Sequence, residues 1–152
     1  MPEAWRIVKT KYAGSAFTGE GARLYGGRWS SKDRPAVYTS STVALATLEM
    51  LVHLETSVTL PAYSLFLLEI PDALIEPLDP TRLPPDWQAF PAPRALQQIG
   101  DAWLISGTTP ALRVPSVIVP TEFNYLLNPR HPRFVDLTVN PPRPYNLDPR
   151  LT

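Results

Sequence analysis

Residues 19–55 read GEGARLYGGRWSSKDRPAVYTSSTVALATLEMLVHLE, and they combine a glycine-rich loop, a short strand and an apolar helix. Four of the seven glycines of the chain lie in this stretch. Residues 36–40 alternate with the two-residue period of a strand, so that Tyr38 and Ser40 share one face. From residue 42 to residue 54 nearly every side chain is apolar, a pattern typical of a helix buried on all sides. The stretch therefore predicts a strand followed directly by a buried helix.

Glu49 lies in the middle of this apolar helix. An ionised carboxylate is costly to bury unless a cation or several hydrogen-bond donors meet it. The helix itself supplies at best His53, one turn further on, which we expect to be a core histidine. The main partner must therefore come from elsewhere, and Arg28 is the nearest candidate. A buried carboxylate near a cleft is commonly functional, either as a base or as a partner for developing positive charge.

A pair of glycines, Gly26 and Gly27, directly precedes Arg28. Adjacent glycines let the backbone approach a ligand closely, and an arginine after them can bind a phosphate or a carboxylate. The alternative is a β-turn followed by a solvated arginine. Neither G-x-G-x-x-G nor G-x-x-x-x-G-K-[ST] occurs, so a nucleotide would be bound by neither a Rossmann site nor a P-loop.

The composition predicts one soluble domain over residues 1–152, with a Pro-rich C-terminal tail from about residue 140. Fourteen basic and 14 acidic residues balance to zero formal charge, which argues against general nucleic-acid binding. No cysteine is present and no stretch reaches the apolar length of a membrane span, so we expect a cytoplasmic protein. His53 and His131 lack the spacing of a metal site, and we expect no metal.

The remaining pattern predicts a mixture of strands and helices. Residues 11–25 are irregular, and residues 76–93 are a Pro-rich surface loop. Strands are predicted at residues 5–10, 63–70, 112–119 and 134–139, a helix at residues 95–105, and a short helical turn at residues 123–127.

Four blocks carry a resemblance to a known family: GARLYGGRWSS, AVYTS, STVALATLEMLVHLE and RVPSVIVPTEFNYLLNP. They resemble the RES domain, the toxin of bacterial RES–Xre toxin–antitoxin pairs. The Arg, Glu and Ser for which this family is named match Arg28, Glu49 and Ser116. The resemblance extends from about residue 5 to about residue 139.

This resemblance implies an α+β fold with a twisted antiparallel β core similar to that of ADP-ribosyltransferases, with a buried helix and peripheral helices. It implies that NAD binds in the cleft as a substrate and is consumed by hydrolysis, phosphorolysis or ADP-ribosyl transfer. The Glu-x-Glu motif of the arginine-modifying enzymes is absent, so water, phosphate and a protein side chain all stay open as acceptors of ADP-ribose.

The resemblance also assigns roles to individual residues. Glu49 and Arg28 are the expected catalytic residues. The expected NAD-binding residues are Arg28, Tyr38, Tyr25, Ser116, Asn124 and Gly27. The two tyrosines could offer flat faces to a base, although core packing is their alternative. Ser116 could bond the ligand or Glu49, and the amide of Asn124 could hold substrate or cap a turn.

The partners implied by the resemblance are an Xre-family antitoxin, NAD, a protein acceptor of ADP-ribose and further copies of the chain within the toxin–antitoxin complex. Direct contact with nucleic acid or a membrane is not expected. A different class of function is a noncatalytic protein-binding module. In that case Arg28 and Glu49 would form a structural ion pair, and the Pro-rich surface would contact another protein.

Overall fold

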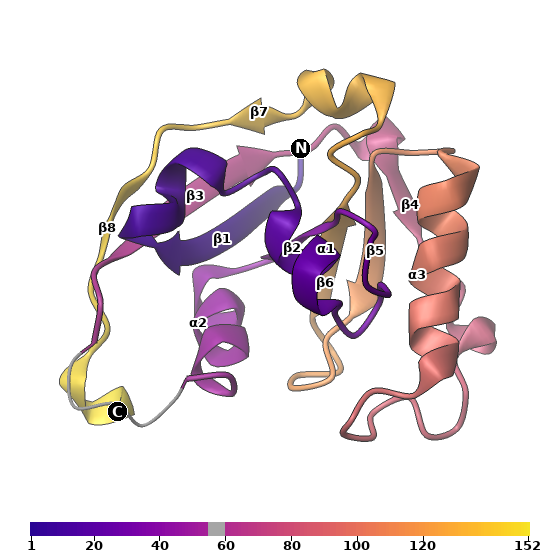
Figure 1. Ribbon diagram of the computed structural model, residues 1–152, viewed down its shortest axis with the longest axis horizontal. Coiled ribbons are helices and arrows are strands. Elements are labelled where there is room, and N and C mark those ends of the chain that lie inside the picture. Colours follow the sequence, from indigo (N-terminus) through magenta and orange to yellow (C-terminus); the bar gives the residue numbers. More distant parts are fainter. Residues whose placement is uncertain (55–59) are drawn as a thin grey trace.

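The computed structural model describes residues 1–54 and 60–152, so Glu55, the last residue of the stretch quoted above, lies outside the described residues. Its eight-stranded sheet has the order β4-β5-β6-β2-β1-β3-β7, and β8 also pairs with β3 (Figure 1). The strands are β1 (Glu3–Lys9), β2 (Val37–Ser40), β3 (Tyr63–Glu69), β4 (Ile75–Pro77), β5 (Ala111–Pro115), β6 (Phe123–Leu127), β7 (Thr138–Val139) and β8 (Arg143–Tyr145). All strand pairs are antiparallel except β4 with β5.

Within residues 1–54 and 60–152, three α-helices accompany the sheet: α1 (Glu20–Tyr25), α2 (Val43–Leu51) and α3 (Arg94–Ser106). Short 3-10 turns lie at η1 (Thr10–Ser15), η2 (Asp72–Leu74), η3 (Pro80–Arg82), η4 (Pro132–Asp136) and η5 (Pro149–Leu151). The predicted α+β class is confirmed. No helix among the described residues is long and apolar enough to cross a membrane.

The core lies on both faces of the sheet because successive residues of a strand point in opposite directions. In β6, Tyr125 and Leu127 enter one hydrophobic cluster, whereas Leu126 enters the other. The second cluster contains Leu96 and Trp103 of α3, which runs beside β4 and β5 in Figure 1. Helix α3 therefore covers one face of the β4–β5–β6 part of the sheet.

The sheet splits between β1 and β2, and this split positions the site. Strand β1 pairs with β3 along its whole length, from Glu3 opposite Glu69 to Lys9 opposite Tyr63. Its pairing with β2 is confined to Trp5 opposite Ser40. Helix α2 packs against both β1 and β2 at this point. The two halves of the sheet diverge there and leave room for a cavity.

Helix α2 differs from its prediction because it is not buried on all sides. Its buried residues are Leu45, Ala46 and Thr47, whereas Leu48 within the helix and Val52 at its C-terminal end are 39% and 60% exposed. An apolar composition shows that a helix can be buried, but the packing of its neighbours decides which side is covered. His53 is likewise exposed, so its prediction as a core histidine is wrong.

Several predicted boundaries are also wrong. Residues 123–127 form strand β6 rather than a helical turn, because they pair with β2 on one side and β5 on the other. Residues 134–139 contain the end of η4 and only the two-residue strand β7. Residues 11–25 hold η1 and α1, and the strand predicted at 112–119 ends at Pro115, which has no N–H to donate. The C-terminal segment adds β8 to the edge of β3.

Candidate functional site

A cavity of about 1080 Å³ lies where β1 and β2 diverge. Its walls come from β1, β2, α2, the loop at residues 26–29 and the loop at residues 88–92. Cavities that bind small molecules commonly measure about 300–1,000 Å³, so this one has room for a ligand of dinucleotide size. Glu49, Arg28, Gly27, Tyr38 and Asn124 all line it, so five of the seven predicted site residues meet here.

Glu49 is held by two side-chain donors from the other half of the sheet. Ser116 Oγ and Asn124 Nδ2 each donate to Glu49 Oε1 at 2.8 Å. Ser116 Oγ in turn accepts the backbone N–H groups of Ile118 and Val119, both at 3.1 Å, so its single proton is directed at the carboxylate. Oε2 has no hydrogen-bond partner among the described residues. One oxygen of Glu49 is thus fixed, and the other remains available on a side chain that lines the cavity.

Asn124 lies on β6 opposite Ser40 of β2. Its Nδ2 must face Glu49, because the opposite amide orientation would place two acceptor oxygens against each other. Its Oδ1 is buried and makes no hydrogen bond with any residue that the structure describes. A buried acceptor without a donor is costly, and such groups often belong to functional sites. The amide of Asn124 therefore holds Glu49 rather than capping a turn.

Arg28 does not pair with Glu49. Its Nη1 donates to the carbonyl oxygens of Trp87 and Ala89 at 3.2 and 3.0 Å, and among the described residues no ion pair joins Arg28 to Glu49. Burial lowers the pKa of Arg28, while Glu49 and Tyr38 act in the opposite direction. The predicted contact between Arg28 and Glu49 is wrong. The guanidinium of Arg28 instead donates to backbone carbonyl groups of the Pro-rich loop, which is distant in the sequence. Arg28 joins that loop to the cavity wall.

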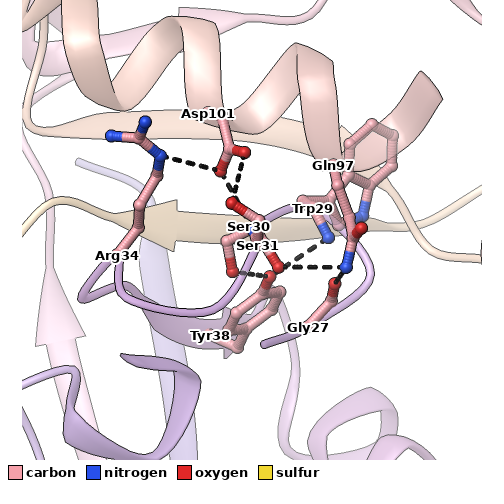
Figure 2. A network of polar contacts seen from close by, with 8 residues as sticks. All are labelled: Gly27, Trp29, Ser30, Ser31, Arg34, Tyr38, Gln97 and Asp101. Carbon is pink, nitrogen blue, oxygen red and sulfur yellow. Dashed lines mark hydrogen bonds and ion pairs between the residues drawn. The ribbon is translucent and has the colours of Figure 1, made fainter. Parts of the chain in front are cut away.

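The loop that carries Arg28 is held by Tyr38 and by helix α3 (Figure 2). The hydroxyl of Tyr38 lies 2.7 Å from Ser30 Oγ and accepts the Trp29 N–H at 3.1 Å. Gln97 of α3 donates to the carbonyl oxygen of Gly27 at 3.0 Å. Burial raises the pKa of Tyr38 to about 12. The hydroxyl of Tyr38 thus holds the loop in place, whereas another part of the residue lines the cavity.

Asp101 of α3 holds the far end of this loop (Figure 2). Its carboxylate accepts the N–H and the hydroxyl of Ser31 at 3.0 and 2.6 Å, and Arg34 lies 3.6 Å away. Gly100 allows this close approach, because a Cβ there would overlap the carbonyl oxygen of Trp29. A Cβ on Gly27 would likewise overlap the Tyr38 hydroxyl. Gly27 and Gly100 thus allow neighbouring segments of the protein to pack closely together.

Arg6 is a site residue that sequence reasoning missed. It lies on β1, lines the cavity, and donates from Nε to Ala16 O and from Nη1 to Tyr38 O, both at 2.8 Å. Burial lowers its pKa to about 10, and it forms no ion pair within the described part of the chain. The only signal in the sequence was a charged residue between Trp5 and Ile7 in a predicted strand. Arg6 therefore presents an uncompensated cation to the cavity.

Two predicted residues lie away from the cavity wall. Tyr25 ends α1 with its side chain 80% exposed, and it does not line the cavity. Ser116 is fully buried behind Glu49, which it bonds. Across residues 1–54 and 60–152, His, Asp and Glu side chains form no group of three or more that could hold a metal ion.

Comparison with known proteins gives a consistent family. The chain is 47% identical over 148 residues to Toxin Res of Yersinia enterocolitica, covering 97% of each protein. It is 39% identical over 153 residues to the Prs ADP-ribosylating toxin of Sphingobium sp., covering 97% of this chain and 94% of that one.

A solved structure shares the fold: the M. tuberculosis MbcT–MbcA toxin–antitoxin complex matches with a TM-score of 0.77 at 20% identity, over 94% of this chain and 83% of that one. The RES domain family matches residues 3–148, nearly the whole chain. With this match and relatives close to half identical in sequence, the chain belongs to the RES domain family.

Proposed function

We propose that this protein is the toxin of a toxin–antitoxin pair, and that it acts by cleaving the nicotinamide–ribose bond of NAD. The observation that carries the proposal is the state of Glu49: Oε1 is held by Ser116 and Asn124, and Oε2 is unpartnered among the described residues on a cavity-lining side chain. The names of the relatives, Toxin Res and Prs ADP-ribosylating toxin, support the same reading.

The chemistry needs a fixed negative charge beside the ribose. When the bond between the ribose carbon and the nicotinamide nitrogen breaks, its electron pair leaves with nicotinamide and positive charge develops on the sugar. A carboxylate that is already oriented stabilises this charge without having to reorganise during the reaction. The two donors to Oε1 keep Glu49 in place, so that Oε2 can face the ribosyl group. An acceptor then forms the new bond to the same carbon and loses its proton.

The cavity also offers cations for the diphosphate of NAD. Arg6 has no carboxylate partner among the described residues, and an anionic group would offset the cost of its partial burial. Arginine is well suited to phosphate because its planar guanidinium presents several donors. Arg28 retains the donors that it does not use on Trp87 and Ala89. We assign the diphosphate to Arg6 and Arg28 together.

The acceptor of ADP-ribose can be water, phosphate or a protein side chain. These give different products: ADP-ribose, a phosphorylated ADP-ribose, or a modified protein. Mass spectrometry of the products formed in buffer, in phosphate and in a cell extract would separate them.

The deciding experiment mixes the purified protein with NAD and measures released nicotinamide, beside Glu49→Gln prepared in the same way. Glutamine keeps the shape of the side chain but removes its charge. We expect the variant to turn over at least about a hundredfold more slowly, with a melting temperature near that of the wild type. No nicotinamide release by the wild type with water, phosphate or cell extract would refute the proposal. A folded variant with near wild-type turnover would remove Glu49 from the mechanism.

For the partner, we propose an Xre-family antitoxin that covers the cavity mouth. The resemblance to RES–Xre pairs supports this, and the M. tuberculosis relative was solved as a toxin–antitoxin complex. Coexpression with an Xre-type antitoxin should restore growth and stop NAD turnover. Growth arrest that persists with that antitoxin present would count against the pairing.

The rival function, a noncatalytic binding module, has less support. It was based on a structural ion pair between Arg28 and Glu49, which is not among the ion pairs of the described residues. The same nicotinamide assay separates the two functions.

A further inference from the structure

The C-terminal strand touches the helix that carries Glu49. Strand β8 pairs with β3, with Tyr145 opposite Tyr63, a residue that lines the cavity. The hydroxyl of Tyr145 lies 2.5 Å from Oγ1 of Thr47, which is 98 residues earlier in the chain and belongs to α2. In Figure 1 the C-terminal segment follows the outer edge of β3. The last strand thus reaches back to a helix formed near the start of the chain.

The direction of this hydrogen bond follows from the other contact of Thr47. Oγ1 of Thr47 also lies 2.8 Å from the carbonyl oxygen of Val43, which can only accept. Thr47 therefore gives its one proton to Val43 and accepts from Tyr145. Because Thr47 is only 6% exposed, water cannot readily replace the tyrosine hydroxyl. The pair is a specific link between β8 and α2.

Thr47 and Glu49 lie on different sides of α2. Two residues along an α-helix correspond to about 200° of rotation, so their side chains leave the helix in nearly opposite directions. Ser116 and Asn124 hold Glu49 on one side, and Tyr145 holds Thr47 on the other. Of the residues of α2, only Leu45, Ala46 and Thr47 are buried, so the hydrogen bonds of Glu49 and Thr47 add to the packing of the helix against β1 and β2. Its orientation therefore depends on contacts at both sides.

We propose that Tyr145 is a positioning residue, which braces α2 from the C-terminal strand and keeps Glu49 Oε2 directed at the ribosyl group of the substrate. This inference rests on the proposed function, because it assumes that Glu49 acts in catalysis. It assigns a role to the Pro-rich segment after residue 140 that goes beyond an extended tail. Strand β8 thus acts on the position of Glu49 through α2, without touching the substrate.

The test removes the hydroxyl group of either residue in the Tyr145–Thr47 hydrogen bond. Tyr145→Phe and Thr47→Val should each lower kcat about tenfold, the worth of one well-placed hydrogen bond, and leave the KM for NAD within about twofold. The double variant should be no slower than Thr47→Val, because that substitution already removes the hydroxyl that Tyr145 binds. Tyr12→Phe is the matched control: Tyr12 is 54% exposed, and its hydroxyl makes no hydrogen bond within the described residues. It should behave as the wild type.

Hydrogen exchange separates failure of this inference from failure of the proposed function. Loss of the brace should speed amide exchange in α2 selectively, even if the wild type releases no nicotinamide. Wild-type kcat in Tyr145→Phe, unchanged exchange in α2, or additive losses in the double variant would each overturn the inference. A loss of kcat that merely follows a lower melting temperature would also overturn it. If Tyr145→Phe does not fold, Thr47→Val provides the same test from the helix side.

Discussion

Ser116 donates its hydroxyl proton to Glu49 across 2.8 Å, although the two residues are 67 positions apart in the sequence. The same oxygen accepts the N–H groups of Ile118 and Val119, so one buried hydroxyl ties the turn after β5 to helix α2. Ser116 is fully buried, so its hydrogen bonds are shielded from solvent. This bond orients the carboxylate on which the proposed mechanism depends.

Ser116→Ala should therefore impair both the site and the fold. Glu49 would keep only Asn124 as a donor, and two backbone N–H groups would lose their acceptor. Hydrogen bonds to charged groups are worth about 1.5–3 kcal/mol, so we expect kcat to fall roughly ten- to a hundredfold, with a lower melting temperature. Ser15→Ala, at an exposed position outside the cavity, is the control. Wild-type turnover in Ser116→Ala would contradict the assigned role.

Arg28→Ala should release the loop at residues 88–92 from the cavity wall, because the guanidinium holds the carbonyl oxygens of Trp87 and Ala89. We expect the KM for NAD to rise by at least about tenfold and limited proteolysis to cut the loop faster. The melting temperature should change little. Arg133→Ala removes an exposed arginine elsewhere and serves as the control. Unchanged protease sensitivity would show that Arg28 does not hold the loop.

Asn124→Asp should lower the rate of NAD turnover. It replaces the amide that donates to Glu49 Oε1 with a second carboxylate, so an attraction at 2.8 Å becomes a repulsion between like charges. We expect kcat to fall at least about tenfold, because Glu49 would lose a hydrogen bond to a charged group. Asn146→Asp, at an exposed position, is the control and should keep wild-type kcat. Equal kcat values for the two variants would refute the expectation.

Phe90→Ala should weaken substrate binding. Phe90 lines the cavity with its side chain 86% exposed, so its ring is available to stack on a ring of NAD. Stacking of one base is worth about 1–3 kcal/mol, which corresponds to a rise in KM of about five- to a hundredfold with kcat nearly unchanged. Nicotinamide mononucleotide, which lacks the adenylate, would show which ring is involved. Tyr12→Ala removes an exposed aromatic side chain outside the cavity and should have no effect.

Tyr38 should make the fold sensitive to alkaline pH. Burial raises the pKa of its phenol to about 12, above the ordinary value of about 10. The folded protein thus holds this proton more tightly than the unfolded chain does. The contribution of Tyr38 to the free energy of unfolding is therefore fully present below about pH 10 and is lost as the pH rises towards 12. Tyr38→Phe cannot ionise, although it loses the contacts with Ser30 and Trp29. The difference in the free energy of unfolding between the wild type and this variant, measured by chemical denaturation, should become smaller between pH 8 and pH 11. A constant difference would contradict the expectation.

The sequence by itself determined the family, the α+β class and five of the residues that line the cavity. These depend on local patterns: the alternation at residues 36–40, the apolar helix after it, and the ordered blocks around Arg28, Glu49 and Ser116. Such patterns can be recognised in a sequence because the periodicity of a strand or a helix is visible within a few residues. The prediction that Glu49 has hydrogen-bond partners also came from its place in an apolar helix, although Glu49 is half-buried and not fully buried as that pattern suggested.

Only the tertiary structure decided which partners those are. The sequence suggested Arg28 for Glu49, but Ser116 and Asn124 hold the carboxylate, and Arg28 bonds a loop about 60 positions away. Residues 123–127 likewise form a strand because β2 and β5 pair with them on both sides. The uncompensated charge of Arg6 and the reach of Tyr145 to Thr47 depend in the same way on contacts between distant segments. Hydrogen bonds form between whichever groups the packed sheet brings within about 3 Å, and separation in the sequence does not encode that distance.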